Sequence, residues 1–362
     1  MKKWLPITGF FILAGCSPQQ SQPIEDTRKY AHGVSIIENS VLWSEESDEQ
    51  RKDAWTHDIY KKEIGETEVD TLVSNPEAQE PVSASSTEES IIITYEDGYD
   101  TENNVSQRFE LYDYNWEKLH EGTLLEGGHS GHVASTNAHH VIFWSNNWVN
   151  GGGVNELGSG KDVIVSTISN EGELLHEVQL SEADDRDSWP MLAASDDNAL
   201  LAWQQFNDKA TKAALHFAVY DPATNELTVE PSELLPQVDF YMYSISYVQA
   251  TEQYVVAAQT KKGGTLLLLE KDGELIDQID APDLVREAVP AVQENTLVFP
   301  QMPSSYFAVQ VSDDEFQLQS SEEVDVEWGM SGTTGMFLDD QNVYFATLKK
   351  EGLEEVTVEI DE

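Results

Sequence analysis

Residues 188–230 read SWPMLAASDDNALLAWQQFNDKATKAALHFAVYDPATNELTVE. The stretch contains four short apolar runs of the length of β-strands: Met191–Ala194, Ala199–Trp203, Ala214–Tyr220 and Leu227–Glu230. Ser-Asp-Asp-Asn separates the first two runs and Asp-Pro-Ala-Thr-Asn separates the last two. Such residues favour turns because their side chains bond the local backbone. The stretch therefore predicts four short strands joined by polar turns.

Weaker copies of this unit recur along the whole chain. One residue marks the end of the second run in each copy: Trp43, Tyr95, Trp144, Trp203, Ala258, Pro300 and Ala346. These markers repeat with a loose period of roughly 50 residues, which is the size of one propeller blade. A polar turn before an apolar residue recurs in phase with them, at Leu119, Leu174, Leu227, Leu275 and Phe316. Helical periodicity is nearly absent.

The markers predict an all-β protein, a β-propeller of seven four-stranded blades over residues 29–362. Only three strands can be assigned to the last blade, one fewer than to the others. We expect residues 26–31 to supply the fourth strand and close the ring. Closure of this kind leaves no open sheet edge, which is the usual hazard of an all-β fold. A ring of six or eight blades, or a pair of β-sandwiches, is the alternative.

The N-terminus has the pattern of an export signal. Residues 1–3 are Met-Lys-Lys, and residues 4–14 are apolar but too few to span a bilayer. Leu13-Ala14-Gly15-Cys16 resembles the lipobox of bacterial lipoproteins, which implies removal of residues 1–15 and attachment of lipid to Cys16. Ser17 after the cysteine resembles the sorting pattern of outer-membrane lipoproteins, so we expect a location in the outer membrane of the cell envelope. Residues 16–28 then form a flexible tether.

The composition is strongly acidic. The 362 residues include 67 Asp and Glu against 20 Lys and Arg, a net charge of −47. This charge excludes nucleic acid as a natural partner, because no basic surface exists to release counterions, and it argues against contact with anionic lipid headgroups. It is typical of a highly solvated, salt-tolerant surface. The single cysteine excludes an internal disulfide and a thiolate metal site, so packing must stabilise the fold.

The candidate site lies at the mouth of the predicted central channel. The loops that lead into the first strands surround this mouth, and they contribute His32, Glu80, His129, Trp189, Tyr243, Glu287 and Trp328. Close by in the sequence lie Arg186, Asp187 and Arg286. Aromatic faces with carboxylates and arginine forks suit a sugar or a peptide, through stacking and bidentate hydrogen bonds. The alternative is that these residues only cap the first strands and pair with local charges.

Two of these loops have the same chemistry. Arg186-Asp187 and Arg286-Glu287 each place an arginine before an acid and a proline a few residues later. We expect a seven-fold ring to bring both pairs to one rim. Trp148, in the glycine-rich loop 146–153, is a second candidate contact. Three other tryptophans are predicted to pack between blades: Trp43, Trp144 and Trp203.

Metal sites and nucleophiles have less support. His129 and His132, with His32 across the ring, offer imidazole ligands, but no fixed carboxylate partner is identifiable. The acidic loop 96–103 offers oxygen ligands to Ca²⁺ without the spacing of an EF-hand, so a solvated charge run is the simpler interpretation. We therefore predict no metal and no cofactor. No Gly-x-Ser-x-Gly elbow indicates a nucleophilic serine.

No motif of a known propeller family is present in the sequence. We expect a membrane-anchored propeller lipoprotein that acts as a non-enzymatic binding or scaffold module for a protein or a glycan. The alternative is a polysaccharide-active hydrolase or lyase with its site at the channel mouth. An enzyme requires a few convergent polar groups with perturbed pKa values in one pocket, whereas a scaffold requires a broad surface patch.

Overall fold

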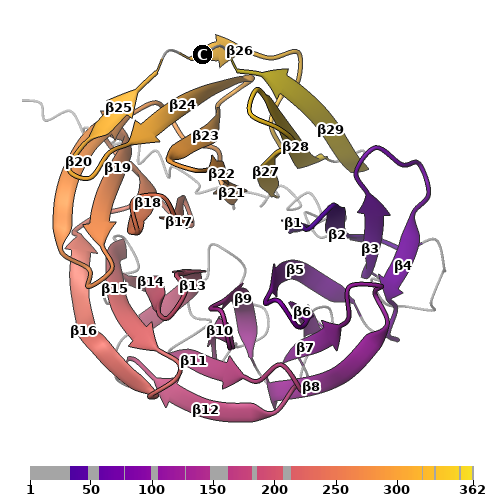
Figure 1. The fold of residues 1–362 in the computed structure, drawn as a ribbon. Helices are drawn as coiled ribbons and strands as arrows, with labels where there is room; N and C mark the ends of the chain where they lie inside the picture. The colour runs from indigo at the N-terminus through magenta and orange to yellow at the C-terminus, as the bar shows by residue number, and fades with distance from the viewer. Residues whose placement is uncertain are drawn as a thin grey trace, which may run out of the picture.

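The protein is a β-propeller of seven blades in the computed structural model, as the markers predicted (Figure 1). The structure describes residues 33–47, 57–76, 78–98, 105–126, 128–146, 162–181, 186–206, 213–319, 321–329, 332–349 and 352–360. Within these ranges the chain forms strands and turns, and no helix there has the length and hydropathy to cross a membrane.

Each of the first five sheets contains four consecutive antiparallel strands, with the first strand near the ring axis and the fourth at the rim (Figure 1). The first three sheets are formed by β1 (Val34–Ile37), β2 (Ser40–Glu46), β3 (His57–Glu63), β4 (Asp70–Val73), β5 (Gln79–Ser86), β6 (Ile91–Asp97), β7 (Ser106–Tyr112), β8 (Lys118–Glu126), β9 (His129–Ser135), β10 (His140–Ser145), β11 (Val163–Ile168) and β12 (Leu174–Gln179). The next two are formed by β13 (Arg186–Ala194), β14 (Ala199–Phe206), β15 (Ala213–Asp221), β16 (Glu226–Leu235), β17 (Tyr243–Val248), β18 (Gln253–Thr260), β19 (Gly263–Glu270) and β20 (Leu275–Ala281).

The last two sheets depart from this pattern. The sixth contains β22 (Ala291–Gln293), β23 (Thr296–Gln301), β24 (Ser305–Val311) and β25 (Phe316–Leu318), and β26 (Glu322–Glu323) also pairs with β24. The seventh contains β27 (Thr333–Phe337), β28 (Asn342–Lys349) and β29 (Gly352–Glu359). Its fourth member is β21 (Ala288–Val289), a short strand that precedes the sixth sheet and pairs parallel to β27.

The second strand of each sheet is covered on both faces, which explains why the markers were readable in the sequence. All six residues of β10 are buried, and so are the first six of β6. A strand enclosed between two neighbouring sheets is apolar along its whole length instead of alternating. Every marker residue lies on a second strand, so the predicted blade period is confirmed.

Seven hydrophobic clusters form the core, and each lies between two neighbouring blades. Trp144 is fully buried, Trp203 is 1% exposed and Trp43 is 4% exposed. The prediction that these three tryptophans pack between blades is therefore confirmed.

Side chains join the last blade to the first. Val34 and Trp43 pack with Tyr344 in one cluster, and the Thr334 hydroxyl donates a 2.7 Å hydrogen bond to the Val34 carbonyl oxygen. Lys62 also pairs with Glu355 across this junction. The expected closing strand, residues 26–31, lies outside the described residues and stays a prediction.

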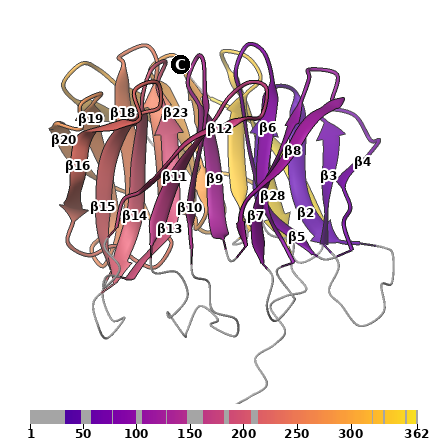
Figure 2. The ribbon, with the colours of Figure 1, turned by 90° about the horizontal axis from the view of Figure 1, so that it is seen from below.

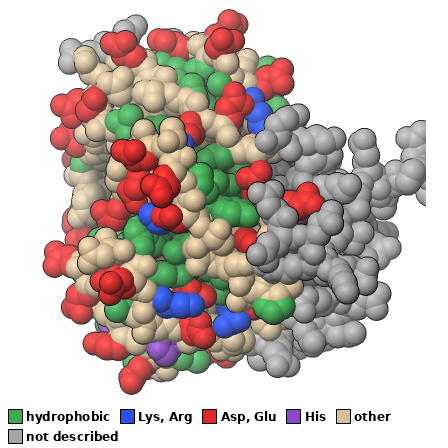
Figure 3. Space-filling view, turned by 90° about the vertical axis from the view of Figure 1, so that its right-hand side faces the viewer, with side chains coloured by type: hydrophobic (Ala, Val, Ile, Leu, Met, Phe, Trp, Pro, Cys, Tyr) green, Lys and Arg blue, Asp and Glu red, His purple; other side chains and the backbone are tan. Residues whose placement is uncertain are grey.

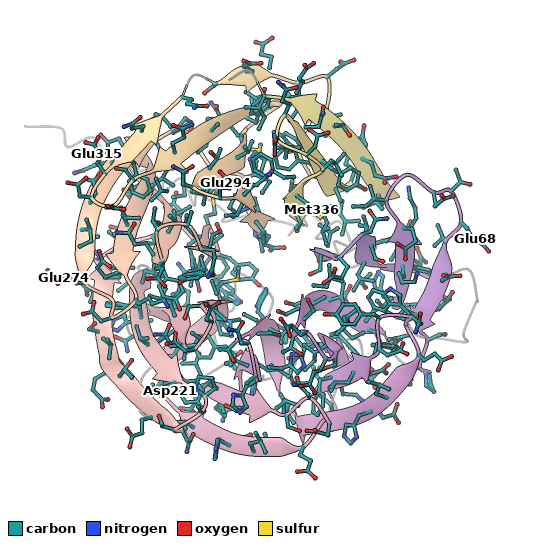
Figure 4. The ribbon with its side chains drawn as sticks, viewed as in Figure 1. Glu68, Asp221, Glu274, Glu294, Glu315 and Met336 are labelled. Atoms are coloured by element: carbon teal, nitrogen blue, oxygen red, sulfur yellow. The ribbon has the colours of Figure 1, made fainter. Side chains whose placement is uncertain are left out.

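Acidic side chains cover the described outer surface. Figure 3 shows many Asp and Glu side chains and few Lys and Arg on one side of the ring. Glu68, Glu274 and Glu315 lie at the outer rim, whereas Met336 of β27 lies near the ring axis (Figure 4). Solvated carboxylates of this kind account for most of the net charge without implying a site.

Candidate functional site

The candidate site lies where β9, β13 and β17 begin and where β6, β10 and β14 end, which we call the mouth end of the ring (bottom of Figure 2). Four residues here have left-handed backbone conformations, with φ of 55° at Ser130, 58° at Trp189, 56° at Tyr241 and 54° at Glu287. Ser130, Trp189 and Tyr241 lie at the inner start of the third, fourth and fifth blades, and Glu287 directly precedes β21 on the segment that leads to β22 of the sixth blade. Non-glycine residues adopt this conformation only where the surrounding structure imposes it, and such residues cluster at functional sites.

The local cause is a repeated irregularity at the start of the first strand. The β13–β14 register shifts between Ser188 and Met191, and the β9–β10 register shifts at the equivalent place. An extra residue in one strand bends it and changes the direction of the side chains. At these positions the regular hydrogen-bond ladder between the first and second strands is interrupted, and side chains are directed toward the mouth end of the ring.

Aromatic rings and an ion pair meet on one side of the mouth end. The Trp189 ring packs edge-on against Phe240, and its centroid lies 5.0 Å from that of Tyr241. The Arg286 guanidinium lies 5.5 Å from the Tyr241 ring centroid, and its Nη2 is 2.9 Å from Glu287 Oε1. All five residues are half-buried, so part of each side chain contacts solvent. We call them the aromatic–arginine cluster.

The surroundings of this cluster favour the protonated, uncharged forms of Tyr241 and Glu287. Burial, then the neighbouring Glu287 carboxylate, raises the pKa of Tyr241 well above its usual range. Burial also raises the pKa of Glu287, although Arg286 opposes that shift. The Tyr241 hydroxyl therefore stays protonated and is a hydrogen-bond donor at neutral pH.

A second group of polar residues is buried where the first three blades meet. Glu80 on β5 lies directly opposite Glu96 on β6. His57 Nδ1 lies 3.2 Å from Glu80 Oε2, and His129 Nε2 lies 3.1 Å from Glu96 Oε2. Ser130 completes this group, which we call the histidine–carboxylate cluster, and no member is more than 8% exposed.

Burial determines the charge state of this second cluster. It raises the pKa of Glu96 well above its usual range, with a further contribution from the Glu80 carboxylate. It lowers the pKa of His129 to about 3 and, against the effect of Asp58, that of His57 to about 4. The contact between His129 and Glu96 therefore joins groups that both prefer their neutral forms, and it is no ordinary ion pair.

The two clusters face the same end of the ring axis. The Glu96 carboxyl group is close enough to add a small contribution to the raised pKa of the Tyr241 hydroxyl, although the two residues belong to the second and fifth blades. His132 lies between them, since its ring contacts the carbonyl oxygens of both Ser130 and Pro190. The mouth end therefore combines aromatic faces, an arginine, acids and imidazoles.

The structure brings together some of the residues that the sequence singled out. Trp189, Arg286 and Glu287 belong to the aromatic–arginine cluster, and Glu80 and His129 belong to the histidine–carboxylate cluster.

Three other candidates are placed in the packed interior. Trp328 is 4% exposed and its Nε1 donates a 2.6 Å hydrogen bond to the Ser305 carbonyl oxygen. Asp187 is fully buried and accepts a 2.7 Å hydrogen bond from Trp203 Nε1. Tyr243 is also buried, and its hydroxyl donates to the Trp189 carbonyl oxygen. The Tyr243 bond joins two neighbouring blades, whereas the Asp187 bond joins β13 to β14 within the fourth blade.

The two arginine–acid pairs do not occupy equivalent positions. When the two loops are aligned on their residues with left-handed backbone conformation, Glu287 corresponds to Trp189. Asp187 lies two residues before Trp189 and is buried in the core. Arg186 is partly exposed and forms no ion pair with a described acid. His32 and Trp148 lie outside the described residues.

Tyr241, Phe240 and His57 belong to the site but were not singled out from the sequence, and Glu96 was considered only as the first residue of the acidic loop 96–103. Glu96 directly follows the marker Tyr95, and a charged residue at the end of a doubly covered strand was a signal that could have been noticed. His57 carried no such signal, because only the ring closure places it beside Glu80.

Metal binding gains no support from the part of the chain that the structure describes. No group of three or more His, Cys, Asp or Glu side chains there has the geometry to hold a metal ion. His129 contacts Glu96 while His132 bonds Pro190, so the two imidazoles are directed to different neighbours. Within the acidic loop proposed for Ca²⁺, residues 99–103 lie outside the described residues.

Comparisons with known proteins give the fold and no family. No family model and no curated protein matches the chain. Its fold is similar to a chain in the mitotic checkpoint complex, with 11% identity, a TM-score of 0.57 and 100% of both chains covered. It is also similar to the polysaccharide lyase Uly1, with 10% identity, a TM-score of 0.56 and 95% and 94% of the two chains covered. For the Hadza microbial sialidase Hz136 the identity is 10%, the TM-score 0.50 and the coverage 85% and 74%.

Proposed function

We propose that the protein is a binding propeller that holds a saccharide at the mouth end of the ring. The aromatic–arginine cluster carries this proposal, because residues from three consecutive blades converge there with their side chains partly open to solvent. Aromatic faces stack on the apolar faces of sugar rings, and an arginine beside a carboxyl orients the hydroxyl groups by hydrogen bonds.

A binding measurement with matched tryptophan variants tests the proposal. Trp189→Ala should weaken binding of the best ligand on a glycan microarray by roughly tenfold or more, since a buried aromatic anchor contributes about 2 kcal/mol. Trp116→Ala is the control, because Trp116 is also half-buried but lies in the β7–β8 turn at the opposite end of the blade. Equal affinities of the two variants, or an array without any bound glycan, would rule out saccharide binding at this site.

Catalysis on a polysaccharide is the second candidate function. The raised pKa values of Glu287 and Tyr241 favour it, since protonated acids beside a bound sugar are suited to general acid catalysis. The similarity of fold to a polysaccharide lyase and a sialidase is compatible with this function without supporting a particular reaction. Release of reducing ends or unsaturated products from a polysaccharide, absent for Tyr241→Phe, would establish it.

We also propose that the protein is anchored in the outer membrane by lipid on Cys16. The sequence Leu13–Cys16 supports this proposal, followed by Ser17 and the polar residues of the tether. Lipid on the N-terminus would hold the propeller in the cell envelope close to its ligand.

A cysteine variant tests the anchor. Cys16→Ala should accumulate as an uncleaved precursor that incorporates no labelled fatty acid, because the cysteine sulfur is the acylation point. Detergent-phase partition and acyl labelling measure this outcome. Normal labelling of the variant would mean that the lipobox pattern is accidental.

A further inference from the structure

Three residues of the histidine–carboxylate cluster contact one another in the order serine, histidine, carboxyl group, which is the order found in sites with a nucleophilic serine. The Ser130 hydroxyl and His129 Nδ1 form a hydrogen bond, and His129 Nε2 lies 3.1 Å from Glu96 Oε2. The serine, the imidazole and the carboxyl group therefore follow one another, with both ring nitrogens engaged. Saccharide binding requires neither of these two contacts.

The fold does not require a carboxyl group at the position of Glu96, because a neutral amide serves the same structural role in other blades. Glu96, Gln204 and Gln259 each directly follow the marker residue of a second strand. Each uses a side-chain oxygen to accept a backbone N–H at the start of the next blade, at 2.7 Å from Ser130, 2.8 Å from Tyr241 and 3.0 Å from Leu284. A neutral glutamine thus serves this structural role in two blades. Only in the second blade is the oxygen part of a carboxyl group that also contacts a histidine.

Ser130 lies at the mouth end of the ring, at the start of β9 in the third blade. Its left-handed conformation is the one that Trp189, Tyr241 and Glu287 adopt at the start of their blades. These three residues form the aromatic–arginine cluster with their neighbours, so Ser130 is the member of the same set on the adjacent blade. Its exposed fraction is 4%, which restricts access to a small group such as an acetyl.

We infer that Ser130 is the nucleophile of an acyl-transfer site that hydrolyses small carboxylic esters, with His129 as general base and Glu96 as the positioning residue. The inference goes beyond saccharide binding and does not depend on it. An O-acyl group on a saccharide bound at the mouth end is the substrate class that both sites would share.

The reaction balances without an oxidant or a cofactor. Ser130 Oγ forms a bond to the ester carbonyl carbon while its proton passes to His129 Nδ1. The carbon–oxygen bond to the alcohol then breaks, and the leaving oxygen takes that proton. Water repeats the sequence on the acyl-serine, which releases the carboxylic acid and restores the hydroxyl. The step requires the His129 tautomer with its proton on Nε2, and Glu96 Oε2, 3.1 Å away, accepts that N–H and so holds the ring in this tautomer.

Covalent trapping with a fluorophosphonate probe tests the inference on the full chain. The probe forms a phosphorus–oxygen bond to an activated serine and releases fluoride, so no substrate has to be known. We expect one probe per chain by intact mass spectrometry, located at Ser130 by peptide mapping. His129→Gln should slow labelling by about a hundredfold, the usual contribution of a general base. Wild-type protein that stays unlabelled at Ser130, or a folded His129→Gln variant that labels at the wild-type rate, overturns the inference.

Two matched variants test whether Glu96 positions His129 for the reaction or only stabilises the fold. Glu96→Gln preserves the acceptor for the Ser130 N–H, as in the fourth and fifth blades, and should keep the wild-type melting temperature. It should nevertheless label about a hundredfold more slowly, because the amide NH2 that replaces Oε2 beside His129 Nε2 is a donor and favours the tautomer with the proton on Nδ1. Ser83→Ala is the control, since the Ser83 hydroxyl on β5 only accepts the Val133 N–H, and it should label like the wild type. If Glu96→Gln labels normally, Glu96 is a structural clamp and the proposed site is wrong.

Discussion

Replacing Trp203 with alanine should lower the free energy of unfolding by about 4 kcal/mol, within the range for deleting a core aromatic side chain. The indole is 1% exposed and packs edge-on against Phe143, at 6.0 Å between ring centroids, in the interface of the third and fourth blades. Its Nε1 also donates to the fully buried Asp187, so truncation removes a hydrogen bond to a buried carboxylate as well as the packing. Urea unfolding followed by circular dichroism measures the loss.

Two further variants separate the contributions. Trp203→Phe keeps most of the ring volume but loses the N–H, so its loss should be smaller than that of the alanine variant and should report the bond to Asp187. Leu275→Ala is the control, because Leu275 starts an outer strand and is 46% exposed. A Leu275 variant that loses as much stability as Trp203→Ala would contradict the assignment of the core to the interfaces between blades.

Acidification from pH 7 to about pH 4.5 should destabilise the fold steeply because it protonates buried histidines. Burial lowers the pKa of His57, His132 and His140 to about 4, whereas each titrates near 6.5 in the unfolded chain. Between these values the unfolded state binds more protons, so stability falls as the pH falls. A shift of this size corresponds to about 3 kcal/mol per histidine once the pH reaches the folded pKa. The raised pKa of Glu96 acts in the opposite direction, since its protonated form is favoured in the folded state.

The pH dependence can be assigned with one histidine and its partner. His140 is fully buried between Ser90 and Ser135, whose hydroxyls lie 2.9 Å and 2.7 Å from its ring nitrogens. The melting temperature of His140→Gln should fall less between pH 7 and pH 5 than that of the wild type, because one titrating group is gone. Ser135→Ala loses a bond but no titrating group, so its curve should run parallel to the wild type. Parallel curves for His140→Gln and the wild type would refute the assignment.

The blade architecture was predictable because it is local and repeated. A second strand between two sheets has to be apolar along its length, and the tight turns between the first and second and between the third and fourth strands favour residues such as Ser, Asp and Asn. Both requirements apply within about 40 residues of chain, as in residues 188–230, so they appear directly in the sequence. The same requirements place Trp144 and Trp203 in the core, as predicted.

The candidate site was predictable only in its location. That Trp189, Arg286 and Glu287 lie at one end of the ring follows from the blade order. Whether a polar residue there faces solvent or the core depends on the left-handed turn at the start of the strand, which the residue types do not reveal. Asp187 illustrates this, since two positions before the turn it is fully buried beneath Trp203.

The sequence by itself therefore determined the all-β class, the number of blades and the end of the ring at which polar and aromatic residues gather. Only the tertiary structure decided which of them meet. Glu80 contacts His57, Glu96 contacts His129, and the Arg286 guanidinium lies over the Tyr241 ring, each across a junction between blades. Local propensity acts over a few neighbouring residues, whereas these contacts depend on the angle and register at which whole sheets pack, to which the buried side chains of every blade contribute.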